Sequence, residues 1–175
     1  STVAGQAPYR RVFDGDAADA RFLAPGGVAL DAAGTAYVSE PSAHVLRRVA
    51  LDGTATTLAG LAGAAGSANG SGASARFRGP AGVAWDPSGS VVLADRENHT
   101  IRRVSPVGEV TTVAGLAGAP GSADGPGNAA RFDDPSGVAV DGLGNVYVAD
   151  RDNHAIRKIT PDGFVRTLAG MPGTH

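Results

Sequence analysis

Short apolar runs alternate with polar turns along this chain, and the alternation is regular. In its C-terminal third, four such runs follow one another at residues 137–141, 146–150, 155–159 and 164–169. Val, Ile, Tyr and Ala dominate the runs, whereas Gly, Asn, Asp and Pro fill the segments between them. The first composition is typical of packed β-strands and the second of tight turns. The pattern therefore predicts four antiparallel strands joined by hairpins.

The same unit recurs with a period of 55 residues. Arg-Phe returns at positions 21, 76 and 131, Gly-Val-Ala at 27, 82 and 137, and a histidine at 44, 99 and 154. The second and third copies, 76–115 and 131–170, agree at 22 of 40 aligned positions. Repeats of about 40–55 residues built from short strands are typical of β-propellers. We predict an all-β fold, namely a β-propeller of four-stranded antiparallel blades with three blades per chain.

The period divides the chain into four segments. We expect residues 1–20 to form the outer strand of a preceding blade plus a linker, 21–75 blade 1 and its linker, 76–130 blade 2 and its linker, and 131–175 blade 3. Three blades leave two apolar faces open, which favours association. A two-fold axis would then close a six-bladed ring from two chains, each supplying half. The alternative is that the chain is a piece of a longer single-chain propeller.

Two competing strands are expected at the ring junction. Residues 164–170 form the longer candidate for the outer strand of the last blade, and a tight turn tethers them to the preceding strand. Residues 2–5 are shorter and follow a diverged loop at 6–20. We expect 164–170 to hold the position, because its loop closes at little entropic cost. Residues 2–5 should fray or add a fifth, edge strand to the last blade of the partner.

The linkers 61–75 and 116–130 are rich in Gly, Ala and Ser. That composition is also typical of flexible linkers. Both copies nevertheless keep Gly-Ser-Ala-(Asn/Asp)-Gly in register and end in Ala-Arg-Phe. This shared register favours ordered loops in which Phe77 and Phe132 pack as plugs.

Composition and charge exclude several classes of function. The net charge is −2, and basic residues interleaved with aromatics are missing, so we expect no nucleic-acid partner. No apolar run approaches 20 residues, so we expect no membrane partner. Zero cysteines rule out disulfides and thiolate metal sites. Fourteen arginines against one lysine indicate a GC-rich, bacterial genome, and an extracellular or periplasmic location is favoured.

The string Val-Tyr-Val-Ala-Asp-Arg-Asp-Asn-His-Ala-Ile-Arg-Lys-Ile at 146–159 resembles the NHL repeat, which is named after its Asn-His-Leu core. Asn98-His99 and Asn153-His154 match the first two positions, whereas the first copy keeps His44 and lacks the Asn. The resemblance implies a β-propeller, commonly six-bladed. It constrains function weakly, because the family includes protein-binding, RNA-binding and extracellular sensor domains and a few lyases.

The repeated ionisable residues suggest structural roles first. His44, His99 and His154 could form a metal site, but blade symmetry spreads them around a wide ring, so we favour turn histidines bonded to nearby backbone. We expect no metal and no cofactor. The carboxylates that end the second strands should pair with arginines on the third strands: Glu40 with Arg47, Asp95 with Arg102 and Asp150 with Arg157. The carboxylates that end the first strands, Asp31, Asp86 and Asp141, should form turns through their side chains.

A propeller commonly binds ligands on the loops that join its second and third strands and its successive blades. On that face the candidate binding residues are Arg96, Glu97, His99, Arg151, Asp152, His154, Asp124, Asp133 and Asp134. The alternative is a merely solvated rim.

Two functions follow from these observations. The first is a non-catalytic binding or scaffold module that self-associates as a homodimer and takes a protein or peptide ligand. The second is an enzyme, a propeller lyase or lactonase with a central divalent metal. Such a site needs several converging carboxylates, histidines or amides at the axis. The axis-facing Gly-Val-Ala strands offer none before their terminal Asp, so we favour the first function and predict no catalytic residue.

Overall fold

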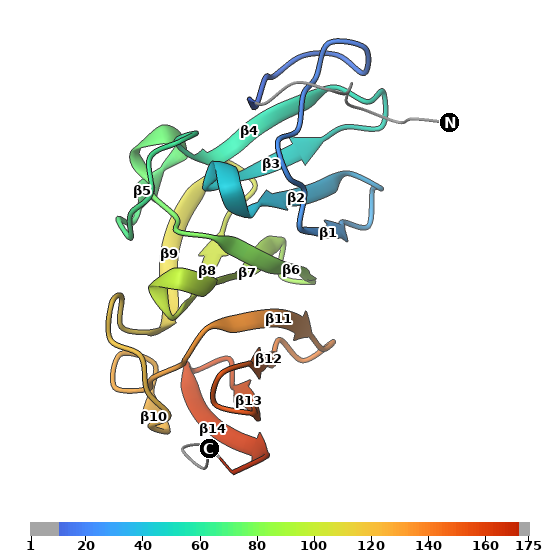
Figure 1. Ribbon diagram of the computed structural model, residues 1–175. Coiled ribbons are helices and arrows are strands. Elements are labelled where there is room, and N and C mark those ends of the chain that lie inside the picture. Colours follow the sequence, from blue (N-terminus) through green and yellow to red (C-terminus); the bar gives the residue numbers. More distant parts are fainter. Residues whose placement is uncertain (1–10, 172–175) are drawn as a thin grey trace.

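The computed structural model describes residues 11–171 of the chain, and their regular structure consists of β-strands and three short 3₁₀ turns. The strands form three antiparallel sheets that follow one another along the chain like the blades of a fan (Figure 1). The predicted all-β propeller architecture is therefore confirmed. The expected strand at residues 2–5 lies outside the described residues.

Each blade is a meander whose strands pair in chain order. Blade 1 contains β1 (Gly27–Leu30), β2 (Ala36–Glu40), β3 (Val45–Val49) and β4 (Ala55–Gly60). Blade 2 contains β6 (Pro80–Asp86), β7 (Ser90–Asp95), β8 (Thr100–Val104) and β9 (Glu109–Gly115). Blade 3 contains β11 (Pro135–Val140), β12 (Val146–Asp150), β13 (Ala155–Ile159) and β14 (Phe164–Ala169). The last three strands of blade 3 have the predicted bounds, whereas β11 begins two residues before the predicted Gly137.

Blades 2 and 3 each carry a fifth strand, which corrects the expectation of four. The linker before each blade folds back, and β5 (Gly70–Ser71) and β10 (Gly125–Pro126) pair with the outer strands β9 and β14. In blade 1, Gly15 takes the same place through a bridge to Ala55. The chain's own linker therefore covers the start of the β14 edge, which is the edge that residues 2–5 of a partner should occupy if they do not fray. The linkers are folded along the blades.

The core lies between the blades. We call the side of a blade that points to the preceding blade its front face, and the opposite side its rear face. Between blades 1 and 2, Tyr37 and Leu46 on the rear face of blade 1 pack against Leu93 and the plug Phe77. Between blades 2 and 3, the aligned layer includes Ile101 and Phe132. Both phenylalanines are fully buried, as the sequence predicted.

A fully buried arginine joins each linker to its blade. In blade 2, Arg102 donates to Asp95 Oδ2 at 2.7 Å, to the carbonyl of Ala68 at 3.1 Å and to Asn69 Oδ1 at 2.9 Å. Its guanidinium also lies 5.4 Å from the centre of the Phe77 ring. A buried charge is tolerated only when it is paired and hydrogen-bonded, so this arginine requires the linker in its folded position.

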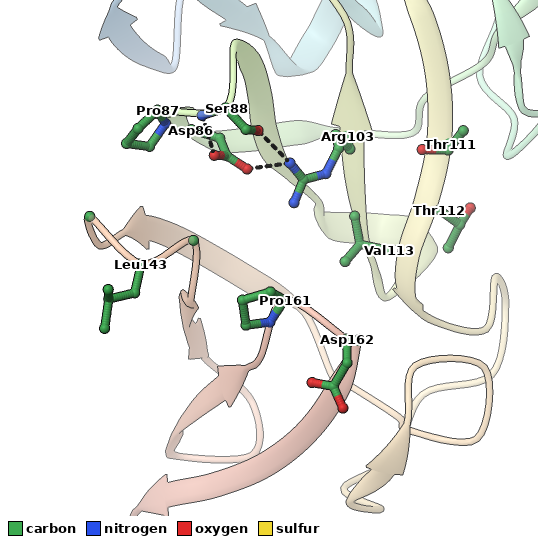
Figure 2. Close-up of a pocket in the computed structure, with 13 residues that line it drawn as sticks. Asp86, Pro87, Ser88, Arg103, Thr111, Thr112, Val113, Leu143, Pro161 and Asp162 are labelled. Carbon is green, nitrogen blue, oxygen red and sulfur yellow. Dashed lines mark hydrogen bonds and ion pairs between the residues drawn. The ribbon is translucent and has the colours of Figure 1, made fainter.

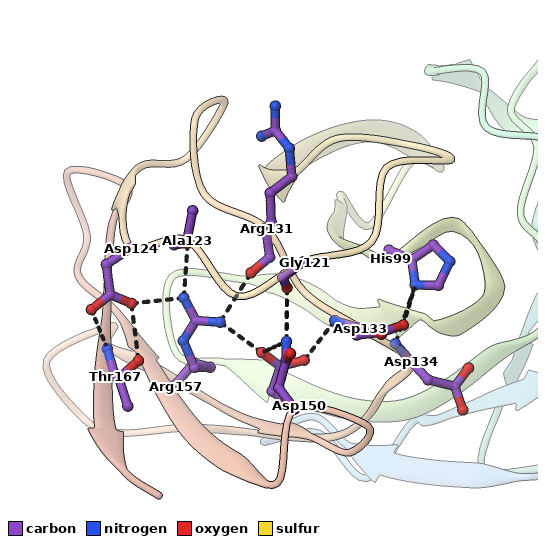
Figure 3. A network of polar contacts seen from close by, with 11 residues as sticks. His99, Gly121, Ala123, Asp124, Arg131, Asp133, Asp134, Asp150, Arg157 and Thr167 are labelled. Carbon is purple, nitrogen blue, oxygen red and sulfur yellow. Dashed lines mark hydrogen bonds and ion pairs between the residues drawn. The ribbon is translucent and has the colours of Figure 1, made fainter. Parts of the chain in front are cut away.

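The same arrangement recurs in the other blades, and we call it the arginine node. In blade 3, Arg157 contacts Asp150 at 2.6 Å and Asp124 at 2.7 Å (Figure 3). In blade 1, Arg47 pairs with Glu40, and both side chains are fully buried. The predicted pairing of these carboxylates with these arginines is confirmed in all three blades.

Three 3₁₀ turns complete the description: η1 (Pro41–Ala43), η2 (Gly72–Ser74) and η3 (Arg96–Asn98). η1 and η3 follow the second strands of blades 1 and 2 and carry part of the loop face. The strand-ending aspartates also form the predicted side-chain turns. Asp141 Oδ1, for example, accepts from the backbone N–H groups of Leu143 and Asn145, both at 2.9 Å.

Removal of one node arginine should strongly destabilise the protein. We expect Arg102→Met to lower the free energy of unfolding by about 3 kcal/mol or more, because Asp95 would stay buried without its counter-charge. Arg48→Met is a control, since Arg48 is an exposed arginine on β3; its effect should stay within about 0.5 kcal/mol. Urea denaturation measures both. Equal losses would contradict the importance of the node.

The carboxylate of the blade 2 node should make stability depend on pH. Burial raises the pKa of Asp95 from 3.8 to about 6, against the hydrogen bonds from Asn98, Arg78 and Arg102. As the pH falls from 7 to 5, the folded state binds a proton that the unfolded chain does not yet bind. The free energy of unfolding should therefore rise by about 1 kcal/mol from this group. Asp95→Asn removes the titration, so the measurement is the difference between wild type and variant in denaturant at both pH values. A constant difference would contradict this assignment.

Candidate functional site

The loop face lies at the ends of the second strands, and the histidines there hold neighbouring blades together. His44 and His99 each follow a 3₁₀ turn in the left-handed conformation, with φ of 62° and 58°. The Nδ1 atom of His44 accepts from the backbone N–H of Gly79, and that of His99 from Asp134, both at 3.2 Å. The hydrogen bond to backbone agrees with the sequence prediction, but the backbone belongs to the next blade. His154 has the same conformation in blade 3, with φ of 52°.

The charged candidates form a connected set of ion pairs that spans blades 2 and 3. Asp134 lies between two arginines, 3.4 Å from Arg96 Nε and 2.9 Å from Arg151. The set continues on one side from Arg96 to Glu97 at 3.6 Å, and on the other from Arg151 to Asp152 at 3.2 Å. Five of the nine predicted residues therefore lie together and largely neutralise one another.

Two further candidates lie next to this set. Asp133 Oδ1 is 3.3 Å from Nδ1 of His99 (Figure 3). The backbone of Asp133 is fixed from both sides: its N–H donates to Asp150 Oδ1 at 2.8 Å, and its carbonyl accepts from the N–H of Asp152 at 3.1 Å. The arginine node of blade 3 therefore positions the loop face as well as the linker.

Asp134 occupies a backbone conformation that disfavours most side chains. Its φ is 50°, and the aligned residue of blade 2 is Gly79, with φ of 61°. Asp tolerates this region better than most residues because its short side chain bonds locally. Asp134 thereby places a carboxylate between Arg96 and Arg151, where blade 2 has only a hydrogen atom.

Asp124 does not join the loop-face ion pairs. It lies on the linker beside β14, where it accepts from Arg157, from the N–H of Thr167 at 2.9 Å and from the Thr167 hydroxyl at 3.1 Å (Figure 3). Burial acts to raise the pKa of Asp124, but the bonds from Thr167 and Arg157 hold it below its usual value. Asp14 bonds Thr57 in the same way in blade 1, so the first loop keeps this contact despite its diverged sequence.

Sequence reasoning gave the motif asparagines no role. Asn98 donates to the Asp95 carboxylate at 2.8 Å and to the carbonyl of Gly66 at 2.6 Å. Asn153 makes the equivalent bonds to Asp150 and Gly121. The available signal was their repetition beside the strand-ending carboxylate. Among residues 11–171, no three His, Asp or Glu side chains lie close enough to hold a metal ion. No helix in that range is long and apolar enough to cross a membrane.

The curated proteins that this chain resembles are much longer than it is, and one of the two described below is named for its NHL repeats. The chain is 38% identical over 86 residues to "NHL repeat-containing protein 2" of Bos taurus, which covers 48% of the chain and 11% of that protein. It is 37% identical over 92 residues to "Protein SUPPRESSOR OF QUENCHING 1, chloroplastic" of Arabidopsis thaliana, covering 52% of the chain and 9% of that protein. The chain thus spans about a tenth of these relatives.

Solved structures of similar fold include a binding protein and an enzyme. An auxiliary nutrient binding protein from Bacteroides thetaiotaomicron matches with a TM-score of 0.66 and 26% identity, over 81% of this chain and 37% of that one. A gluconolactonase from Xanthomonas campestris matches with a TM-score of 0.60 and 18% identity, over 83% of this chain and 47% of that one. At that identity the second likeness shows the fold alone.

The family model described as "NHL repeat" matches residues 77–104 and 132–159. These ranges run from the plugs Phe77 and Phe132 to the ends of β8 and β13, and they contain the node carboxylates, asparagines and arginines. Blades 2 and 3 therefore each contain a segment that matches the NHL repeat, and the described residues fold as three blades of a β-propeller.

Proposed function

We propose that this chain is a non-catalytic binding module whose three blades close a six-bladed ring with a second copy. The observation that carries the proposal is the exposure of core positions on the two outermost blade faces. The same aligned positions are covered at both junctions within the chain.

The front face of blade 1 exposes residues whose counterparts are covered. Val28 and Leu30 are 65% and 61% exposed, whereas the aligned Val83 is 9% exposed and packs against blade 1. A contiguous exposed apolar patch on the face of a sheet commonly marks an interaction site.

The rear face of blade 3 shows the complementary pattern. Ile156 is 41% exposed and Leu168 49%, whereas Leu46 and Ile101, aligned with Ile156, are fully buried against the following blade. Gly170 aligns with Gly60 and Gly115, where a Cβ atom would lie 3.0 and 3.3 Å from the plug rings Phe77 and Phe132. We infer that Gly170 leaves room for Phe22 of a second copy in the same way.

A second copy fits both faces at once. The front face of one copy would pack on the rear face of the other, as within the chain, and a two-fold axis would generate two identical junctions. Six blades is the number that three blades per chain and one two-fold axis produce. The alternative is that further blades of a longer chain cover both faces.

The loop face is the proposed ligand surface, for a protein or peptide partner. Its charges are fixed by ion pairs between blades 2 and 3, which makes the surface rigid and lowers the entropic cost of binding. Because those charged groups are paired with one another, the surface supports a binding role better than a catalytic one. The likeness to a lactonase concerns the fold alone, so we do not propose that activity for this chain.

Ring closure predicts the mass in solution and its response to mutation. We expect twice the 17.3 kDa of one chain by light scattering at micromolar concentration. Val28→Glu on the front face, or Ile156→Glu on the rear face, should each give monomers, because a charge would be buried at both junctions. Val107→Glu is the control, since Val107 is 83% exposed at the β8–β9 turn, away from both faces.

An equimolar mixture of the two face variants sharpens this test. Each variant keeps one intact face, so the mixture should form open dimers with a single junction at higher concentration. A wild-type monomer under all conditions would overturn self-closure and favour further blades as the occupant.

The loop face can be tested with a displayed peptide library selected on the wild-type protein. We expect enriched peptides to lose about tenfold in affinity on Arg151→Ala, because a charged hydrogen-bonding group is removed. Arg166→Ala is the control, since Arg166 is an exposed arginine on β14. Peptides that bind both variants equally would place the ligand surface elsewhere.

A further inference from the structure

An open cleft of about 740 Å³ separates blades 2 and 3 at the end of the propeller opposite the loop face. The turn between β6 and β7 and the strands β8 and β9 form one wall, and the β11–β12 and β13–β14 turns form the other (Figure 2). Its size is within the range of small-molecule sites. Sequence reasoning assigned it no role.

We attribute the cleft to two departures from the repeat, at positions that pack in the core layer between the blades and do not themselves line the cleft. Between blades 1 and 2, Tyr37 and Trp85 stack with ring centres 5.3 Å apart and fill the corresponding space. Between blades 2 and 3, the aligned residues are Val92 and Val140. Both valines pack in that layer, but they have much smaller side chains, so space is left toward the turns.

The valine at position 92 also changes the hydrogen-bond partner of the turn aspartate in blade 2. In blades 1 and 3, the turn aspartates Asp31 and Asp141 accept from the hydroxyls of Tyr37 and Tyr147, at 3.3 and 3.2 Å. Val92 has no hydroxyl, and in blade 2 Arg103 donates to Asp86 instead.

Arg103 is only partly used by that pair. One of its terminal nitrogens, Nη1, contacts both Asp86 and Ser88. Figure 2 shows the guanidinium above Pro161, with another nitrogen turned into the cleft. The side chain is 31% exposed, against 0% for the node arginine Arg102. One wall therefore offers N–H donors that carry positive charge.

The opposite wall carries an unused carboxylate. Asp162 is exposed at the β13–β14 turn and makes no hydrogen bond or ion pair within residues 11–171. The aligned Asp52 of blade 1 is used by its own turn, where it accepts from the N–H of Thr54 at 2.9 Å. Pro87, Val113 and Leu143 add apolar surface to walls that are otherwise mostly polar.

We propose that this cleft binds a short peptide of two or three residues with both termini free. Its carboxylate would accept from Arg103, its ammonium group would donate to Asp162, and an apolar side chain would contact Leu143 and the prolines. A purely anionic ligand would face Asp86 and Asp162, and a purely cationic one would face Arg103, so opposite charges at two ends match the cleft best. The cleft lies within one chain, so the proposal does not depend on ring closure.

The probe is the tripeptide alanyl-leucyl-alanine, titrated at millimolar concentration into ¹⁵N-labelled protein. We expect saturable shifts in the amide signals of Asp162, Gly163 and Thr111. Acetylating the amino end or amidating the carboxyl end should each weaken binding about tenfold, because each removes one charge-assisted contact. The Val28→Glu variant should bind as the wild type does, which separates this test from that of the ring.

Two variants test the walls directly. Asp162→Asn should weaken binding about tenfold, whereas the matched Asp52→Asn should leave it unchanged. Val140→Trp copies the residue of blade 2 into blade 3, so it should fill the cleft and abolish binding while the fold is kept. No saturable binding by the wild type, equal binding of the capped peptides, or equal affinity of the two Asn variants would overturn the proposal.

Discussion

The fold depends on a guanidinium that is buried in every blade. Arg47, Arg102 and Arg157 have no exposed side-chain surface, so each needs a carboxylate and several acceptors within reach. The blade supplies the carboxylate, but backbone carbonyls of the linker supply other acceptors, at Phe13, Ala68 and Ala123. If the linker moved away from its blade, the buried guanidinium group would lose these hydrogen-bond acceptors. This explains how segments composed of Gly, Ala and Ser are folded, although their composition resembles that of flexible chain.

Much of this arrangement could be predicted from the sequence because its signals are local or periodic. Alternating apolar runs placed the strands, and the spacing of Asp95 and Arg102 across one hairpin predicted their pairing. The edge strands β5 and β10 could not be predicted, because two residues of Gly, Ser or Pro carry no strand signal. The partner of His99 was also missed, since it lies 35 residues away in the next blade.

The cleft escaped prediction for a different reason. A repeat is recognised by the agreement between its copies, whereas the cleft lies beside positions where the copies disagree, Val92 and Val140. Once the blades are known to pack in register, each disagreement becomes informative. Blade 2 has Val92 where blades 1 and 3 have a tyrosine, so Asp86 lacks the hydroxyl partner that the other turn aspartates have. Arg103 donates to Asp86 instead. The sequence contained this information, but only the packing showed that the two valines share one layer.

Shared and divergent positions therefore have different roles in this propeller. The positions that agree, such as the node arginines and the plugs, build the same kind of junction between blades 1 and 2 and between blades 2 and 3. Such positions cannot distinguish one blade from another. Positions free of the node can differ without breaking a junction, as Asp134 differs from Gly79 on the loop face and Asp162 from Val107 at the opposite end. Specific recognition by a set of nearly equal blades must arise at these exceptions, and each proposed ligand surface contains one of them, Asp134 on the loop face and Asp162 in the cleft.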